Sequence, residues 1–265
     1  RIDHVVQELT GLSRADIKGM FHHRCVTRNG SPVENPADRV EMGDVVGVRH
    51  DPHRRYHAPP AQRATWAFRI VHEDSDLVVV EKPAGLLSVP TDRGETNTLI
   101  DLLSKHVGRQ RRRGRALAVH RLDRGTSGLL VFAKHPQAAE GLTQQFRQHT
   151  VLREYIALVA GHMRQKSGTF RSEMRTNRGL HRYSTSEGER GETAVTHYRV
   201  DRELSGATLA RIKLETGRRN QIRVHFAEAG HPVLGDDRYT PELATHPAWT
   251  KKRLALHAAI LGFRH

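Results

Sequence analysis

A tight turn that leads into an apolar run, residues 120–134 (HRLDRGTSGLLVFAK), most constrains the fold of this chain. Residues 125–128 are turn formers, and residues 129–133 have the length and branching of a buried strand. Asp123 therefore stands just before a turn that leads into the core. Two interpretations are open from the residues alone. Asp123 accepts backbone N–H bonds within the turn, or it is a rigidly held carboxylate that reaches a cleft.

The charge of the chain points to a polyanionic partner. The sequence holds 43 Lys and Arg against 29 Asp and Glu, a formal net charge of +14 with a pI near 10.6. Residues 1–60 are almost neutral, so the rest of the chain carries nearly all of the excess. Nucleic acid is favoured over a membrane surface as the partner. Aromatic residues make up 5%, which argues against a platform that stacks many bases.

Composition also bounds the compartment and the chemistry. A chain of 265 residues with 37% hydrophobic residues can bury one large and one small domain. The sequence contains no run of 18 apolar residues, no signal-peptide pattern and one cysteine, so we expect a cytoplasmic protein without membrane span or disulfide. The 19 histidines are scattered and lack metal-ligand spacing, and we expect neither a metal nor a cofactor.

The run HRLDRGTSGLLVFAK closely resembles the signature motif of the RluA-type pseudouridine synthases. In that family the Asp of HRLD is the catalytic residue, which the resemblance carries over to Asp123. Further motifs follow in the family's order: VVVEKPAGLLSVP with Lys82, REYIALV with Tyr155, and LETGRRNQIRVHF with Ile222 and Arg223. The resemblance implies that Tyr155 faces the uracil and assists loss of the C5 proton, directly or as part of the pocket. Arg223 is the expected charged partner of Asp123. For Lys82, RNA contact and a structural role at the strand exit are both open.

The same motifs supply two more candidates and one departure. A target uridine must leave its stack before a carboxylate can reach C1′, and the resemblance implies that Arg121 fills the gap. His120, beside it, is counted with the substrate-binding residues. The departure is Asn220, where the family usually has His. Because both side chains donate and accept hydrogen bonds, we expect altered local bonding more than lost chemistry.

Residues 1–50 predict a separate small module. The apolar spacing of residues 2–9 predicts a helix, and Ser13 caps a second one ahead of an Asn-Gly hairpin and a further strand. This order resembles the S4 RNA-binding domain. The resemblance implies that Arg14 and Lys18, four residues apart on one helix face, meet phosphates. A solvated helix face is the alternative.

The larger part of the chain predicts one catalytic domain. Residues 51–64 hold three prolines and predict a linker, so this domain covers residues 65–265. Within it we expect helices at 99–107 and 138–148, several paired strands, and an arginine-rich surface loop at 108–115. The resemblance implies an α+β fold around a mixed, mostly antiparallel sheet, with the cleft crossing its middle.

The resemblance implies an isomerase, an RNA pseudouridine synthase, in which Asp123 attacks C1′ or removes the 2′-proton. The S4-like module favours large-subunit ribosomal RNA over transfer RNA as substrate. Two alternatives belong to other classes. A non-catalytic RNA-binding or ribosome-assembly protein could share the fold, and a glycosidase would release free uracil, although hydrolysis normally pairs two acids. We expect a monomer.

Overall fold

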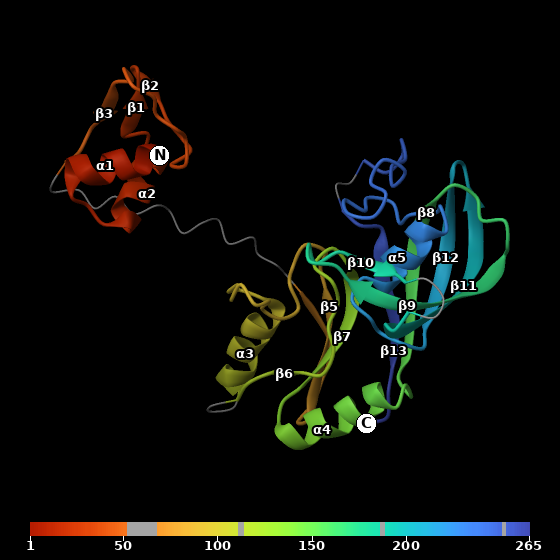
Figure 1. Ribbon diagram of the computed structural model, residues 1–265. Helices are drawn as coiled ribbons and strands as arrows, with labels where there is room; N and C mark the ends of the chain where they lie inside the picture. The colour runs from red at the N-terminus through yellow and green to blue at the C-terminus, as the bar shows by residue number, and fades with distance from the viewer. Residues whose placement is uncertain (52–67, 111–113, 186–188, 251–252) are drawn as a thin grey trace. The chain divides into compact units, whose positions relative to one another are not determined.

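The computed structural model describes residues 1–51, 68–110, 114–185, 189–250 and 253–265 (Figure 1). The chain divides into two compact units, Arg1–Trp66 and Ala67–His265. The predicted linker lies outside the described residues, except for Asp51. The three central arginines of the predicted loop at 108–115 lie outside them too. Within the described ranges, no helix has the length and apolar character needed to cross a membrane.

The first unit combines two helices with a small antiparallel sheet. Helices α1 (Ile2–Thr10) and α2 (Arg14–His22) precede strands β1 (Val26–Arg28), β2 (Ser31–Pro32) and β3 (Val46–Val48), whose sheet order is β2-β1-β3. Ser13 caps α2 as predicted, because its hydroxyl accepts a hydrogen bond from the backbone N–H of Asp16. Strands β1 and β2 pair around Asn29 and Gly30, both with positive φ, which confirms the predicted hairpin turn.

The core of this unit is small and differs from the prediction at one position. Ile2 and Val6 of α1 are fully buried, and they pack with Ile17, Met20 and other residues of α2 and the sheet. Leu9, which fits the same helical stripe, is 63% exposed. Its position in the last turn of α1 carries it past the edge of the small core, so the stripe overestimates the buried face.

The second unit is built on one ten-stranded sheet. Along the sheet the order is β10-β9-β11-β12-β8-β13-β7-β5-β4, and β6 pairs with β7. The strands are β4 (Arg69–Glu73), β5 (Leu77–Lys82), β6 (Leu117–Ala118), β7 (Ser127–Ala133), β8 (Leu152–Ala160), β9 (Ser167–Thr176), β10 (Arg182–Ser184), β11 (Glu192–Leu204), β12 (Ala207–Leu214) and β13 (Leu256–Gly262). In the described sheet β7 and β13 run parallel and the other pairs are antiparallel. The predicted α+β fold with a mixed, mostly antiparallel sheet is therefore confirmed.

Three helices accompany this sheet: α3 (Leu99–Gln110), α4 (Pro136–Arg147) and α5 (Gln221–Glu228). Phe132 of β7 shares a core cluster with Leu103 of α3, whereas its neighbour Val131 shares a cluster with Leu142 of α4. Because successive strand residues point to opposite faces, α3 and α4 cover opposite faces of the sheet. Both α3 and α4 were predicted within a few residues of their ends. The predicted loop at 108–115 is wrong at its start, because α3 continues to Gln110. Helix α5 was not predicted as a helix.

A close approach of two strands forms the middle of the sheet. Gly128 of β7 lies opposite Ala258 of β13, with φ +117°. A Cβ atom on Gly128 would lie 2.2 Å from the carbonyl oxygen of Ala258, so only glycine fits. The turn before β7 is shorter than predicted, because the strand already begins at Ser127. Asp123 thus stands four residues before the central strand.

Candidate active site

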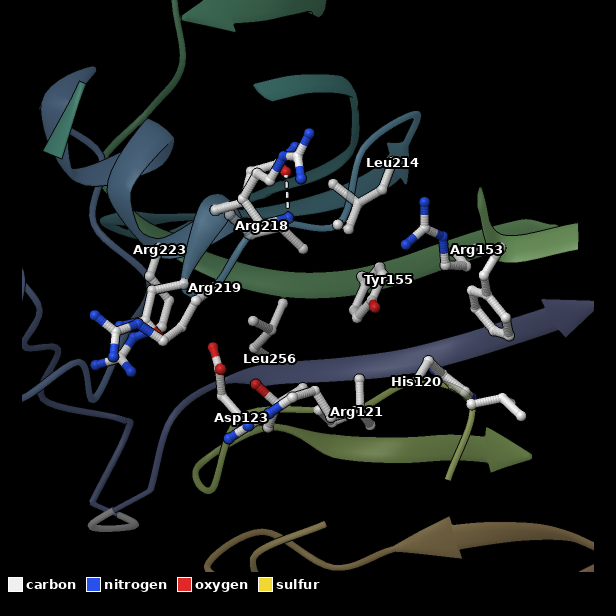
Figure 2. Close-up of a pocket in the computed structure, with 18 of the residues that line it drawn as sticks. His120, Arg121, Asp123, Arg153, Tyr155, Leu214, Arg218, Arg219, Arg223 and Leu256 are labelled. Atoms are coloured by element: carbon white, nitrogen blue, oxygen red, sulfur yellow. Dashed lines mark hydrogen bonds between the residues drawn. The ribbon is translucent and has the colours of Figure 1, made fainter. Parts of the chain in front are cut away.

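A pocket of about 580 Å³ opens over the middle of the large sheet. Its wall comes from the loop before β7, from β8 and β13, and from the segment that leads into α5 (Figure 2). Six of the nine predicted site residues line it: His120, Arg121, Asp123, Tyr155, Ile222 and Arg223. A pocket of this size suits a nucleoside-sized ligand.

The loop that carries Asp123 is held from both sides by the segment after β5. The backbone N–H of Leu122 donates to Ser88 Oγ at 3.1 Å, and that hydroxyl donates to the Leu122 carbonyl at 2.8 Å. On the other side of Asp123, the carbonyl of Arg124 accepts from the Gly85 N–H at 2.7 Å. Fixing the backbone on both sides of one residue limits the positions that its carboxylate can take.

Of the two roles left open for Lys82, its surroundings favour the structural role at the strand exit over RNA contact. Its side chain is 0% exposed, and Lys82 is not among the residues that line the pocket. Its ammonium donates to the carbonyls of Leu86 at 2.7 Å, Pro83 at 3.0 Å and Arg124 at 3.2 Å. These three bonds use all three donors of the group, so Lys82 ties the segment after β5 to the Asp123 loop.

Two opposing effects set the charge state of Asp123. Burial raises the pKa of this carboxyl, because a charged carboxylate loses hydration there. The positive charges of Arg223, Arg121, Arg219 and Lys82 oppose that rise. In the free protein burial is the larger effect. The cationic side chains around the carboxylate favour its ionised form, which an attack on ribose requires.

Arg223 is anchored by an acid other than Asp123. Its guanidinium donates to both carboxylate oxygens of Asp236, each at 2.7 Å, and also to Asp237 at 3.4 Å. The side chain of Asp236 is completely buried. Arg223 thus acts on Asp123 through space, and the direct partner that the resemblance implied for Arg223 is replaced by Asp236. The sequence gives no local signal for this pair.

Tyr155 and His120 are both held in their neutral forms. Burial raises the pKa of Tyr155, on β8, to about 12. Burial also lowers the pKa of His120 to about 3, and its Nε2 accepts a hydrogen bond from the Val131 backbone N–H at 3.1 Å. The His120 ring stacks on Phe146 with 4.4 Å between centroids. His120 therefore shapes the pocket wall, and Tyr155 presents a phenol.

The pocket is strongly basic. Asp123 is the only acid among the described residues that line it, together with six arginines: Arg121, Arg147, Arg153, Arg218, Arg219 and Arg223. Figure 2 shows Arg219 and Arg223 beside Asp123, and Arg153 near His120 at the opposite end. The sequence analysis missed four of these arginines. The Arg-Arg pair inside the LETGRRNQIR motif could have signalled two of them, but Arg147 and Arg153 carry no such signal.

Arg14 and Lys18 belong to the first unit and not to this pocket. Both are exposed on α2, and they line a separate, smaller hollow together with Arg1 and His4 of the same unit. The prediction that they share one helix face agrees with their positions. Their contact with phosphate remains a prediction.

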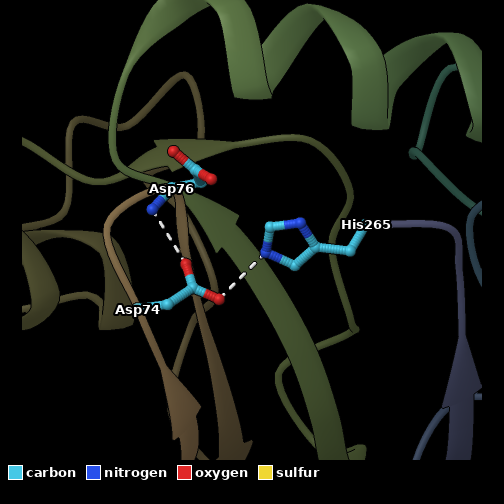
Figure 3. A group of neighbouring side chains, drawn as sticks. All are labelled: Asp74, Asp76 and His265. Carbon is cyan, nitrogen blue, oxygen red and sulfur yellow. Dashed lines mark hydrogen bonds and ion pairs between the residues drawn. The ribbon is translucent and has the colours of Figure 1, made fainter.

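Among the described residues, one group has a spacing that could hold a metal ion: Asp74, Asp76 and His265 (Figure 3). Hydrogen bonds account for this arrangement. Asp74 accepts from the backbone N–H of Asp76 at 2.8 Å and of Leu77 at 2.9 Å in the turn between β4 and β5. Its other oxygen lies 2.9 Å from His265 Nε2. None of the three residues lines the pocket of Asp123.

Among the described residues, a single carboxylate in a basic pocket on a mixed sheet suits an enzyme that uses carboxylate chemistry on a polyanion. The model of the RNA pseudouridylate synthase family matches residues 76–228, which include every described lining residue of this pocket except Leu256. The chain belongs to that family, and it is an RNA pseudouridine synthase, an isomerase.

Individual relatives agree with the family match. The chain is 37% identical over 278 residues to ribosomal large subunit pseudouridine synthase D of Zymomonas mobilis, covering 100% of this chain and 86% of that protein. The protein of the same name from Nitrosomonas europaea is 34% identical over 275 residues, covering 100% and 77%. Among solved structures, human RNA pseudouridylate synthase domain containing 1 superposes with a TM-score of 0.61 and 25% identity, covering 74% and 78%.

Proposed function

We propose that this enzyme converts uridine to pseudouridine in large-subunit ribosomal RNA, with Asp123 as the catalytic carboxylate. The observation that carries the assignment of Asp123 is its position as the only acid in the described wall of a pocket with six arginines. The relatives named for the large ribosomal subunit, which align with the whole chain, support ribosomal RNA as substrate. The net charge of +14 suits such a polyanion.

The reaction needs one carboxylate and no change of oxidation state. The C1′–N1 bond of uridine breaks, the uracil turns, and a C1′–C5 bond forms. C5 loses a proton and N1 gains one, so atoms and electrons balance. An ionised Asp123 can attack C1′ directly, or it can take the 2′-proton and return it to C2′ when the C1′–C5 bond has formed.

Tyr155 contributes a neutral ring in this proposal. Its raised pKa, about 12, keeps the phenol protonated near neutral pH. A protonated phenol is a hydrogen-bond donor and a poor proton acceptor in the free enzyme. We propose that it faces the uracil and donates a hydrogen bond. Ile222, 5% exposed, supplies an apolar contact beside it.

Arg121 fills the space that the flipped uridine leaves. The residue is exposed at the pocket and stands two positions before Asp123. Flipping costs a few kcal/mol in a stacked RNA and much less in an unpaired one. The Arg121→Ala variant should therefore lose roughly 10- to 100-fold in kcat/KM on structured RNA and much less on a short unpaired RNA. Tritium release from both RNAs measures the difference.

The matched control is Arg147→Ala, which removes another exposed cation from the same pocket. It should reduce kcat/KM to a similar degree on both RNAs, because it alters charge without altering the flip. Equal losses on the two RNAs for Arg121→Ala would refute the wedge role.

We further propose that residues 1–50 are an S4-like RNA-binding domain, joined by the linker 51–64 to the catalytic domain 65–265. Replacing both Arg14 and Lys18 with Ala should raise KM for ribosomal RNA and leave kcat unchanged. It should also reduce the slope of log Kobs against log salt by about 2, because each phosphate contact contributes about 1. Filter binding at several salt concentrations measures the slope.

A double variant of the same unit provides the control for this prediction. Arg24 and Arg39 are both exposed there, and replacing both with Ala removes the same charge from other positions. If the two double variants change the salt slope equally, the Arg14 and Lys18 face of α2 has no special part in RNA binding.

Two further proposals concern the oligomeric state of the enzyme and its location in the cell. We propose a cytoplasmic monomer, since its single cysteine, Cys25, suits a reducing compartment and ribosomal RNA is made and modified in the bacterial cytoplasm. Gel filtration with light scattering tests the monomer, and cell fractionation tests the location.

Tritium release from RNA labelled at uracil C5 tests the function itself, with ribosomal and transfer RNA supplied separately. Release from ribosomal RNA, with the pseudouridine recovered in the RNA, is the expected result. Release from transfer RNA alone would show that the substrate is transfer RNA and not ribosomal RNA. Free uracil in place of pseudouridine would indicate a glycosidase, and tight RNA binding without any release would indicate a non-catalytic protein.

A further inference from the structure

Asn220 occupies an unusual place at the edge of the pocket. It directly precedes α5 with φ 57° and ψ 16°, in the left-handed region that few residues other than glycine adopt. The residue is 8% exposed, lines the pocket, and does not cap the helix with its side chain. Residues held in this backbone region collect at functional sites, because the surrounding structure must offset the cost.

The side-chain amide of Asn220 lies between the Asp123 carboxylate and the Tyr239 hydroxyl. One orientation satisfies both neighbours. It places the amide nitrogen 2.8 Å from Asp123 Oδ2 and 3.3 Å from Oδ1, and the amide oxygen 2.9 Å from Tyr239 Oη. An ionised carboxylate can only accept hydrogen bonds, so this is the orientation that matches ionised Asp123. The reverse orientation requires a proton on Asp123.

We propose that Asn220 is a positioning residue, whose amide is oriented by the hydroxyl of Tyr239 and donates to the carboxylate of Asp123. The hydrogen bond fixes the direction of the carboxylate and favours its ionised form over the protonated form. This inference rests on the proposed role of Asp123. It assigns a function to a position where the chain departs from the family motif.

The local surroundings explain why such a donor is useful. The charged or titratable groups that face Asp123 come from four parts of the unit. They are Lys82 at the end of β5, Arg121 in the loop of Asp123, Tyr155 on β8, and Arg219 and Arg223 at α5. The cationic side chains in this group act on Asp123 through space. Arg223 donates its hydrogen bonds to Asp236 and Asp237. Asn220 is the described residue placed to donate directly to the carboxylate.

The first experiment measures the pKa of Asp123 itself in the free, full-length protein. Carboxyl ¹³C NMR of protein labelled at the aspartate side chains follows each titration, and the signal absent from Asp123→Asn identifies Asp123. Asn220→Ala should raise the pKa of Asp123 by about one to two pH units, the amount expected for one lost hydrogen bond to a charged group. An equal pKa in both proteins overturns the proposal.

Two further variants separate positioning from packing. Asn220→Asp keeps the size and the tolerance for a left-handed backbone, but it sets a second carboxylate beside Asp123. It should raise the apparent pKa values of the pair further, since two like charges cannot both ionise easily. Asn220→His restores an N–H donor and should bring the pKa of Asp123 back toward that of the wild type. No recovery would argue against a donor role.

The control for backbone strain alone is Asn97→Ala. Asn97 is also left-handed, with φ 62°, but it is exposed and does not line the pocket. Thermal melts of all variants confirm that they fold. Asn97→Ala should lower the melting temperature while leaving the pKa of Asp123 and the pH profile unchanged. A shifted Asp123 pKa in this variant would show that general loosening produces the effect.

Kinetics complete the test. In a plot of kcat against pH, the acid limb should move to higher pH in Asn220→Ala. In Asn220→His it should return toward the wild-type position. KM should stay nearly constant in both variants. An unmoved acid limb contradicts the proposal. If the wild-type enzyme releases no tritium, the proposed function fails while the NMR titration still decides the role of Asn220. The two failures are therefore distinguishable.

Discussion

Replacing Asp123 with Asn should lower kcat by about 10⁴-fold or more, while RNA binding stays close to that of the wild type. The change keeps the shape of the side chain and removes only the negative charge that reacts with the ribose. The six arginines in the described wall of the pocket, which we propose bind the polyanion, are unchanged. Tritium release measures kcat, and filter binding on the same RNA measures affinity.

Asp237→Asn is the matched control for this variant. Asp237 also lies near Arg223, but its side chain is 95% exposed. It should retain most of its activity, because it has no access to the reacting ribose. If Asp123→Asn keeps activity within about tenfold of the wild type, the carboxylate is not the reacting group. The assignment of the site would then be wrong even though the family stands.

The Asp123→Asn variant should also differ from the wild type in stability. Burial raises the folded-state pKa of Asp123, so between the unfolded and folded pKa values the folded protein binds more protons. The free energy of unfolding therefore falls as the pH rises through that window. At neutral pH Asp123→Asn should unfold at a higher temperature than the wild type. Near pH 4 and below that advantage should disappear, and thermal melts at both pH values measure it.

Local signals in the sequence were enough to predict the elements whose structure depends on neighbouring residues. The Asn29-Gly30 hairpin and the Ser13 cap depend on residues within a few positions of each other, and both are present. The strand predicted after Asp123 is also present. A short apolar run that follows a turn is typical of a buried strand. In each case the interacting groups are close in the chain.

Helix α5 was missed because it has no polar face to reveal its period. Six of its eight residues are buried: Gln221, Ile222, Val224, His225, Phe226 and Ala227. Two of these are polar, and their burial depends on partners elsewhere. Gln221 donates to the Val195 carbonyl and His225 bonds with Thr196, both on β11. A pattern that mixes polar and apolar residues inside the core gives no helical stripe.

Long-range partners explain what the sequence could not predict about the site. Lys82 is typical of a surface residue, but the carbonyl of Arg124, 42 positions away, helps to bury its charge. Arg223 finds its anchor in Asp236, and the Asn220 amide meets Asp123 across nearly 100 residues of chain. Motif resemblance located the residues of the site. Their pairing became visible only with the fold.

Replacing Gly128 with Ala should be among the most destabilising single changes in the second unit. The new Cβ would meet the Ala258 carbonyl oxygen at 2.2 Å and the Ala258 nitrogen at 2.5 Å, both backbone atoms that cannot rotate away. The φ of +117° adds strain for any residue with a Cβ. We expect a loss of about 4 kcal/mol or more in the free energy of unfolding. In a unit of this size that lowers the melting temperature by roughly 10 °C.

Gly141→Ala is the matched control, because it adds the same methyl group where nothing lies within 4 Å. Gly141 is exposed in the interior of α4, so alanine there should raise the free energy of unfolding by about 0.5–1 kcal/mol. Gly128→Ala should also reduce turnover, since separating β7 from β13 shifts the Asp123 loop relative to Leu256 of β13, which lines the same pocket. A shift of about 2 °C corresponds to roughly 1 kcal/mol or less. If both variants melt within that range of the wild type, β7 and β13 do not approach as closely as described. The central parallel pair would then not set the geometry of the site.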